Sequence, residues 1–207
     1  MTEVTASRRS RFTPEREAKL YAAVLDLLGE VGYDALTMDA VAARTRSGKA
    51  TLYRQWGGKV GLVIAAMRHN RHSGIAGVDT GSLRGDLDAL LAHEDDAALE
   101  RTSSLMRGLA MAAHHHPDLG RAFREQLVEA ELDELRQALR RAVKRGEIRA
   151  DNPALDHVAH MLVGALLVLG LLEDAPPTRA FLRGYVDAVV LPALVTRPTP
   201  RTGAPPT

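Results

Sequence analysis

The residues best suited to bind another molecule lie in one short stretch, KATLYRQW at residues 49–56. Its polar side chains carry hydrogen-bond donors and two positive charges, which suit the edges of DNA bases and the oxygens of phosphates. These side chains belong to Lys49, Thr51, Tyr53, Arg54 and Gln55. Leu52 and Trp56 are spaced to share one face of a helix, which leaves the polar side chains outside the packed stripe. The stretch therefore predicts a short helix that displays polar groups to a nucleic acid.

Other chemistry has little support in the sequence. Cysteine is absent, which excludes disulfides, thiolate metal sites and a cysteine nucleophile. The run His114-His115-His116 does not predict a metal site, because consecutive helical side chains point about 100° apart. No glycine-rich phosphate loop, nucleophile elbow or paired metal-ligand motif is present. We expect no catalytic residue, no metal and no cofactor.

The elements that position the polar stretch are two short helices and the turn between them. Thr37 is a suitable N-cap for a helix over 38–44, residues 45–48 break it, and a second helix covers 49–55. Two helices joined by a tight turn form the scaffold that places a recognition helix in the major groove. The apolar residues that would lock them together are Val41, Leu52 and Trp56.

The rest of the chain has the pattern of an all-α protein. Of its 207 residues 45% are hydrophobic and only 4% are aromatic, and the apolar spacing is helical. Further helices are expected over 14–31, 59–72, 82–94, 97–115, 117–145, 153–172 and 178–195. The organisation predicted is a flexible basic arm (1–12), a three-helix DNA-binding domain (13–58) with a linking helix (59–72), a C-terminal domain (73–196) and a disordered tail (197–207).

Charge and hydropathy limit the kinds of partner that the chain can have. The net charge of +1 does not by itself indicate a nucleic-acid binder, although residues 1–60 carry ten basic and seven acidic residues. Lys49 and Lys59 each begin a helix, where a cation opposes the helix dipole unless a phosphate lies nearby; the alternative is that solvent screens both. The most apolar run, 158–172, contains His160 and is shorter than the roughly 20 residues of a membrane span. With no signal sequence visible, we expect a cytoplasmic protein without a membrane partner.

The run TMDAVAARTRSGKATLYRQWGGKVGLV resembles the helix-turn-helix of the tetracycline-repressor (TetR/AcrR) family. The resemblance implies an N-terminal DNA-binding domain, a C-terminal helical ligand-binding and dimerisation domain, and contacts from Thr37, Tyr53 and Lys59 to phosphates. It places Lys49, Thr51 and Arg54 near bases or the adjacent backbone, with Gln55 in reach of either. The expected DNA interface comprises Thr37, Arg46, Ser47, Lys49, Ala50, Thr51, Tyr53, Arg54, Gln55 and Lys59.

The turn departs from the family pattern. Arg46 stands where the family usually has glycine, and Gly48 stands where it usually has the capping serine. Arg46 and Ser47 would add phosphate contacts, and the geometry of the turn is open to question. The basic arm, with Arg8, Arg9 and Arg11, would enter a minor groove or remain solvated.

The helix over 158–172 is apolar on nearly every face and must be covered. A second copy of the chain is the simplest partner, which predicts a homodimer; the alternative is that this helix forms the core of the single chain. The expected interface residues are Leu162, Leu166, Leu169, Tyr185 and Val189. Candidate residues for an effector pocket, or alternatively for ordinary core packing, are Met106, Met111, Phe123 and Met161.

These features predict a transcriptional repressor. Two recognition helices about 34–36 Å apart would read a palindromic operator. The resemblance further implies that a small molecule binds the C-terminal domain and releases the dimer by preferring a state that no longer matches that spacing. A small helical enzyme that uses the histidines and carboxylates, and an interaction module that has lost DNA binding, are the competing functions.

Overall fold

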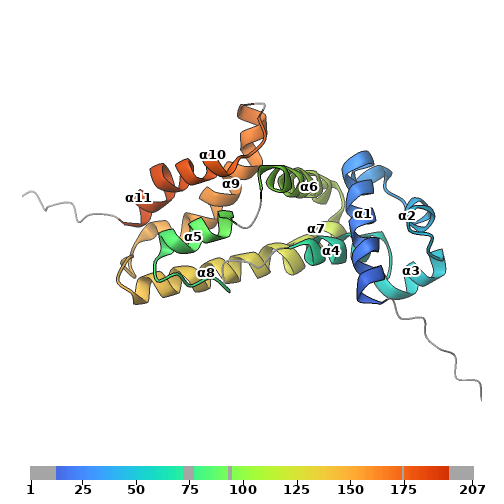
Figure 1. Cartoon of the computed structure of the whole chain (residues 1–207), viewed down its shortest axis with the longest axis horizontal. Helices are drawn as coiled ribbons and strands as arrows, with labels where there is room; N and C mark the ends of the chain where they lie inside the picture. Colours follow the sequence, from blue (N-terminus) through green and yellow to red (C-terminus); the bar gives the residue numbers. More distant parts are fainter. Residues whose placement is uncertain (1–12, 72–76, 93–94, 174, 196–207) are drawn as a thin grey trace, which may run out of the picture. The chain divides into compact units, whose positions relative to one another are not determined.

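The computed structural model describes residues 13–71, 77–92, 95–173 and 175–195. These residues form helices joined by turns, with no strand among them. The first group of helices is α1 (Pro14–Ala35), α2 (Met38–Thr45), α3 (Lys49–Trp56), α4 (Lys59–Asn70), α5 (Leu83–Ala92) and α6 (Asp96–His115). The second group is α7 (Pro117–Phe123), α8 (Glu129–Lys144), α9 (Val158–Leu172), α10 (Arg179–Tyr185) and α11 (Leu191–Leu194) (Figure 1).

The chain divides into two compact units. The N-terminal unit contains residues 1–71 together with 108–127, and the C-terminal unit contains 72–107 and 128–207. The sequence-based division at residue 72 had assigned 108–127 to the C-terminal domain. In the structure these residues pack with the N-terminal helices, because α7 lies against α4. The predicted arm and tail lie outside the described residues.

Helix α1 forms the base of the N-terminal unit. Its N-cap is Thr13, whose Oγ1 accepts the backbone N–H of Arg16 at 3.3 Å, and Pro14 occupies the first turn. The helical spacing buries Leu20, Val24, Leu27 and Leu28, whereas Val31 is exposed. Gly32 leaves helical geometry at φ 75° and ψ 171°, so the helix breaks where the glycine predicted it. Helix α4 covers α1 with Leu62, Val63, Ile64, Ala66 and Met67, all of them buried.

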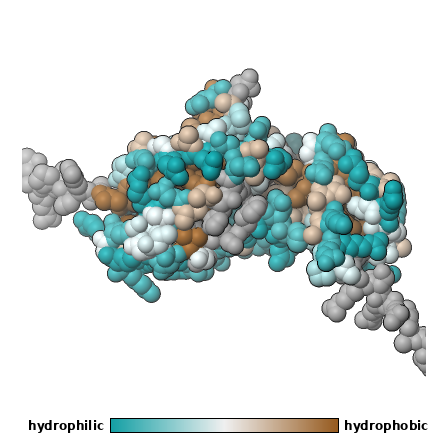
Figure 2. Space-filling model, in the orientation of Figure 1, coloured by the Kyte–Doolittle hydropathy of each residue, from teal (hydrophilic) through white to brown (hydrophobic). Residues whose placement is uncertain are grey.

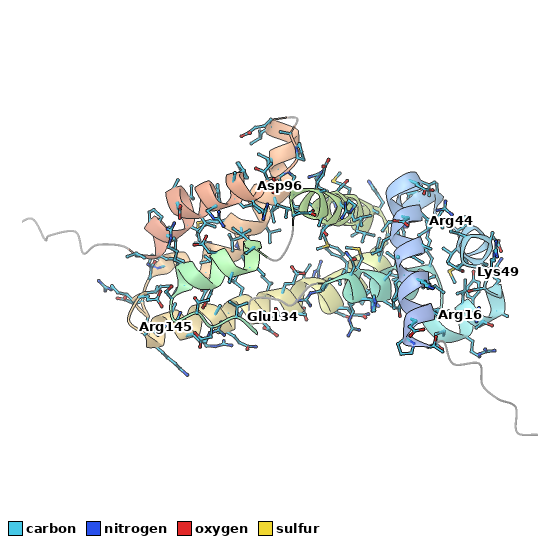
Figure 3. The ribbon with its side chains drawn as sticks, viewed as in Figure 1. Arg16, Arg44, Lys49, Asp96, Glu134 and Arg145 are labelled. Atoms are coloured by element: carbon cyan, nitrogen blue, oxygen red, sulfur yellow. The ribbon has the colours of Figure 1, made fainter. Side chains whose placement is uncertain are left out.

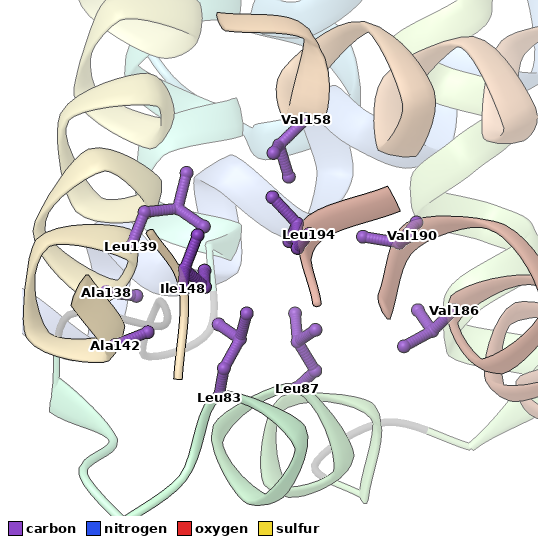
Figure 4. Close-up of a cluster of buried hydrophobic side chains, with 10 residues drawn as sticks. All are labelled: Leu83, Leu87, Ala138, Leu139, Ala142, Ile148, Val158, Val186, Val190 and Leu194. Carbon is purple, nitrogen blue, oxygen red and sulfur yellow. The ribbon is translucent and has the colours of Figure 1, made fainter. Parts of the chain in front are cut away.

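The C-terminal unit is built around a core of aliphatic side chains from α5, α8, α9 and the last helical segments (Figure 4). Its members are Leu83, Leu87, Ala138, Leu139, Ala142, Ile148, Val158, Val186, Val190 and Leu194. Beside this core lies Asp86, which is fully buried. Its carboxylate accepts the backbone N–H and the hydroxyl of Thr80, and the guanidinium groups of Arg141 and Arg145 approach within 4 Å.

Two of the predicted helices are interrupted. The helix expected over 117–145 contains a π-helical segment at Arg124–Val128, which no residue pattern signalled. The helix expected over 178–195 contains another at Val186–Val190, just before Pro192. Proline lacks an N–H and its ring crowds the carbonyl one turn earlier, which accounts for the wider turn there. Residues Pro153–His157 form a 3₁₀ turn before α9, and the linking helix ends at Asn70 rather than at residue 72.

Candidate nucleic-acid interface

Helices α2 and α3 are held together from behind by apolar side chains. Leu52 is 0% exposed and Val41 is 1% exposed, so both predicted scaffold residues lie in the core. The α2 N-cap is Thr37, as its sequence position predicts, with its Oγ1 accepting the N–H of Ala40 at 3.1 Å. A two-point ion pair between Arg44 and Glu30 ties α2 to α1 at 2.7 Å and 3.2 Å. The helix pair is therefore fixed on its inner side by packing and on its outer side by charge.

Trp56 anchors the end of α3 through a hydrogen bond as well as through packing. Its indole Nε1 donates to the hydroxyl of Tyr21 at 3.0 Å, and that hydroxyl donates to Oε1 of Glu17 at 2.6 Å. The two rings meet edge to face, with centroids 5.9 Å apart. Burial, reinforced by the hydrogen bond with Glu17, raises the pKa of Tyr21 to about 12, so the phenol stays neutral. The chain of hydrogen bonds thus runs from the recognition helix into α1.

The turn between α2 and α3 tolerates its unusual arginine. Arg46 adopts a left-handed conformation, φ 49° and ψ 42°, and is the one non-glycine residue with positive φ among the described residues. Its N–H donates to Ala43 O, and the N–H of Ser47 donates to Ala42 O, which is the Schellman pattern of helix termination. The strain of a side chain in this conformation is about 1–2 kcal/mol. The turn geometry is therefore preserved at an energetic cost that glycine would avoid.

Helix α3 presents its polar side chains to solvent. The exposed residues of its outer face are Lys49, Ala50, Tyr53, Arg54 and Gln55. Tyr53 is 46% exposed despite its large ring, and Thr51 is half-buried. In the turn, Arg46 is exposed and Ser47 is half-buried. We call the surface formed by these residues of the turn and α3 the α3 face; Figure 3 labels Lys49 on it.

Lys49, at the start of α3, has a protein partner. Its Nζ donates to Asp39 Oδ2 at 2.8 Å, and this hydrogen bond raises the pKa of the ammonium group. Both side chains are largely exposed. The ion pair supplies a negative charge at the N-terminus of α3, so the unfavourable dipole of Lys49 does not by itself indicate a phosphate. The position of Lys49 in the sequence is therefore weaker evidence for a phosphate contact, although its side chain is exposed as expected.

Lys59 is also occupied within the protein. Its Nζ donates to Tyr33 O at 2.9 Å, lies within 3.5 Å of Asp34 O and sits 4.2 Å from the centroid of the Tyr33 ring. These carbonyls lie just after the break of α1 at Gly32 and accept hydrogen bonds from the ammonium group. The position of Lys59 at the start of α4 therefore does not by itself indicate a phosphate, because carbonyl oxygens of the protein already accept hydrogen bonds from its ammonium group.

The expected pocket residues belong to different units. Met161 is half-buried and packs against the core of the C-terminal unit, and Met106 belongs to the same unit. Met111 and Phe123 belong to the N-terminal unit, and Met111 is 69% exposed. The pocket therefore stays a prediction without a geometric basis for this set of four.

The expected dimer residues differ in exposure. Leu169 is only 4% exposed, so it is already covered within the single chain. Leu162 and Tyr185 are half-buried against the core, Leu166 is also half-buried, and Val189 is 38% exposed. Three exposed apolar residues of α9 were not predicted: Val163, Val168 and Leu172, at 47%, 41% and 76%. Helical periodicity alone could not separate them, because every position of α9 is apolar or nearly so.

Sequence reasoning also missed two supporting residues of the interface. The hydroxyl of Tyr21 accepts a hydrogen bond from the indole N–H of Trp56, and Asp39 forms an ion pair with Lys49. The spacing of Glu17 and Tyr21, one turn apart on α1, was the one available signal for the first. Nothing in the sequence signalled the second, because Asp39 and Lys49 lie on different helices. Among the described residues, no group of three or more histidine, aspartate or glutamate side chains is placed to hold a metal ion.

Comparisons with known proteins cover both units. Residues 20–66 match the model for bacterial regulatory proteins of the tetR family, and residues 78–189 match the model for the tetracyclin repressor-like C-terminal domain. An uncharacterized HTH-type transcriptional regulator from Mycobacterium tuberculosis is 36% identical over 187 residues, 89% of this chain and 90% of that protein. A DNA-binding transcriptional repressor TetR from Mycobacteroides abscessus is 35% identical over 179 residues, 85% of this chain and 92% of that protein.

Solved structures agree with the sequence relatives. The crystal structure of a TetR family transcription regulator is 28% identical, covers 87% of this chain and 98% of its own, and superposes with a TM-score of 0.63. A TetR-family regulator from Rhodococcus sp. is 21% identical, covers 86% and 99%, and shares the fold with a TM-score of 0.66. These relatives are transcriptional regulators rather than enzymes. With its helix-turn-helix and both family domains matched, the chain belongs to the TetR family of DNA-binding transcriptional regulators.

Proposed function

We propose that this regulator is a repressor that binds a palindromic operator as a homodimer and leaves it when a small molecule binds the C-terminal unit. The observation that carries the proposal is the α3 face, whose polar side chains are exposed while Leu52 and Val41 are buried behind them. A surface backed by a rigid core holds its donors in a fixed register on the DNA.

The α3 face divides into two kinds of contact. Thr51, Arg54 and Gln55 carry groups that fit base edges, because arginine pairs with guanine and glutamine with adenine in the major groove. Tyr53 and Lys49 suit phosphate oxygens, the first through its hydroxyl and the second after exchange of Asp39 for a phosphate. Ala50 presents no bulk that would hold the helix away from the groove. In this proposal Lys59 supports the end of α1 and does not contact DNA directly.

The dimer surface is proposed on α9 and the helical segments that follow α10. One segment among the described residues, Pro153–Gly170, is long and apolar enough to cross a membrane by length and composition, and 11% of it is buried in the single chain. Core helices of soluble proteins meet the same criterion. Regulators of this family act as dimers, so a second copy is the partner that we propose for Val163, Val168 and Val189. Brown apolar patches break the hydrophilic surface of the C-terminal unit in Figure 2.

Release by a small molecule requires a difference in affinity. A ligand that bound the DNA-bound and free dimers equally would shift nothing, however tightly it bound. The proposal therefore requires that the ligand favour a dimer whose two α3 helices no longer span one turn of DNA, about 34–36 Å.

The test is selection of bound sequences from a random DNA library with the purified full-length chain. We expect a palindromic consensus, and we expect Tyr53→Ala to abolish binding to it while the protein remains folded and dimeric. Arg124→Gln is the matched control, because Arg124 is exposed in the same unit but lies outside the helix-turn-helix. A chain that selects no consensus, or a Tyr53→Ala variant that binds the operator like the wild type, would refute the assignment. A reporter gene placed behind the selected operator then distinguishes repression from activation.

A further inference from the structure

Helix α6 carries an arginine, Arg107, that has a buried nitrogen with no partner among the described residues. The Nη1 atom of Arg107 is sealed from solvent and has no hydrogen-bond partner. Within the part of the chain that the structure describes, no ion pair to this guanidinium is found either. Its neighbour across the C-terminal unit is Gly170 near the end of α9, where a Cβ would lie 3.6 Å from Nη1. A cationic group therefore faces a position that lacks a side chain.

A second polar side chain lies one turn away on the same helix. Ser103 is 8% exposed, and no hydrogen bond to its hydroxyl is found in the described residues. Residues separated by one helical turn lie on the same side of the helix, so the hydroxyl and the guanidinium occupy neighbouring positions. Together they offer one neutral donor and one charged donor to whatever lies beside α6.

Asp86 Oδ2 and Arg145 Nη2 are also buried without a hydrogen bond, but they carry opposite charges and lie 3.6 Å apart, whereas no such counter-charge faces Arg107 among the described residues. Asp86 accepts two hydrogen bonds from Thr80 and faces two arginines. Asn152 donates to the carbonyl of Leu194 at 2.7 Å and caps the backbone N–H of Ala154 at 2.8 Å. A fold that gives these groups partners or counter-charges, but gives the buried Nη1 of Arg107 neither among the described residues, is typical of a site completed by a bound molecule.

The chemistry of the pair selects the class of molecule. A charged N–H group that is excluded from water, as at Nη1 of Arg107, is destabilised unless an acceptor satisfies it, and an anion does so best. The C-terminal end of α9 supplies a partial negative charge near Gly170, which tolerates the cation but does not satisfy its N–H groups. A carboxylate accepts two hydrogen bonds from a guanidinium side by side and a further one from a hydroxyl.

We infer that the small-molecule effector is an organic anion whose carboxylate binds Arg107 and Ser103, with its apolar body beside α6 and α9. Because α9, whose Gly170 lies beside Arg107, is apolar along nearly its whole length, the anion carries a hydrophobic group rather than further charges. The inference rests on the proposed ligand-responsive function and specifies the ligand class.

The first experiment needs no ligand. Arg107→Met keeps the volume of the side chain and removes its charge, and Arg101→Met makes the same change at an exposed position of α6. We expect the melting temperature of the ligand-free protein to rise by about 2–4 °C in Arg107→Met, because an unsatisfied buried donor is removed, and to stay unchanged in Arg101→Met. A fall in Arg107→Met would mean that the guanidinium has a structural partner, within the chain or across the dimer, and would overturn the inference.

The second experiment uses benzoate and octanoate, with benzamide as the neutral counterpart. At about ten times its Kd, a carboxylate that binds the native state raises the melting temperature of a protein of this size by about 3–5 °C. We expect that rise in the wild type and in Arg101→Met but not in Arg107→Met, and we expect none from benzamide. No rise with either carboxylate in the wild type, or an equal rise in Arg107→Met, would overturn the anion site.

Operator binding separates this inference from the proposed function. Arg107→Met should bind the selected operator like the wild type but should no longer be released by the carboxylate that releases the wild type. If the carboxylate binds through Arg107 and the operator complex persists, the anion site stands and ligand release fails. If a neutral molecule releases both proteins equally, ligand release stands and the anionic effector is refuted.

Discussion

The ion pair between Lys49 and Asp39 offers the sharpest test of the α3 face. Lys49→Gln and Asp39→Asn break the same contact of 2.8 Å between two largely exposed side chains. If the pair only supports the fold, the two variants should have the same consequence. If Lys49 exchanges Asp39 for a phosphate on the operator, their effects on DNA binding must have opposite signs, because one removes the cation and the other removes its competitor.

The magnitude follows from counterion release. Each phosphate neutralised by a lysine steepens the dependence of log K on log salt concentration by about 0.9. With one Lys49 in each protomer of the dimer, Lys49→Gln should make that slope shallower by about 1.8. The affinity deficit of this variant should then shrink about tenfold between roughly 50 and 200 mM salt. Asp39→Asn should bind the operator more tightly than the wild type, with a slope at least as steep.

The assay is fluorescence anisotropy with the labelled operator at several salt concentrations, together with thermal unfolding of each variant. Exposed ion pairs contribute little to stability, so both variants should unfold close to the wild-type temperature. Glu30→Gln is the matched control, because it removes a carboxylate from the other exposed ion pair of the helix-turn-helix, with Arg44, and should affect operator affinity less than Asp39→Asn. Equal weakening by Lys49→Gln and Asp39→Asn, with unchanged salt slopes, would refute the role of Lys49 at a phosphate.

Three further predictions concern the support of the α3 face. Tyr21→Phe should lower the free energy of unfolding by about 1–3 kcal/mol, because the indole of Trp56 loses its acceptor. The pKa of Tyr21 is 10.0 in the unfolded chain and about 12 in the folded protein, so its contribution to stability is complete below pH 10 and is lost as the pH rises through 12. Chemical denaturation at alkaline pH should therefore show a smaller loss of unfolding free energy in Tyr21→Phe than in the wild type. Arg46→Gly should raise stability by about 1 kcal/mol by relieving the left-handed backbone, and yet weaken operator binding if Arg46 contacts phosphate; calorimetry and anisotropy check the two halves. Gly61→Ala should destabilise the N-terminal unit, because a Cβ there would overlap the carbonyl oxygen of Trp56, and a melting temperature equal to that of the wild type would contradict the close approach of α3 and α4.

The helix-turn-helix could be predicted in detail because its signals are local. Capping at Thr37 and the stop at Gly32 depend on residues within one turn of each helix end, and the structure confirms both. The shared face of Leu52 and Trp56 follows from helical spacing in the same way. Pro192 is a local signal for the interruption that precedes it, although the helix expected over 178–195 runs through this position.

The partners of charged residues could be predicted less well from the sequence. Lys59 binds carbonyls at the end of α1, and Asp39 binds a lysine on the next helix. Such contacts depend on how separate helices cross, and no spacing within a single helix encodes that angle. For the same reason, periodicity could not tell the buried Leu169 from the exposed Val163 on a helix that is apolar all round.

The sequence by itself determined that the chain is helical, where the recognition helix begins and ends, and which of its faces carries donors, since all three follow from interactions between residues a few positions apart. Only the tertiary structure decided that Lys59 is occupied, that Lys49 has a competing carboxylate, and that no carboxylate of the described residues pairs with Arg107. Whether a charge has a partner depends on groups that are distant in the chain and that packing brings within a few ångströms. The degree of burial then sets how much free energy an unpaired charge costs.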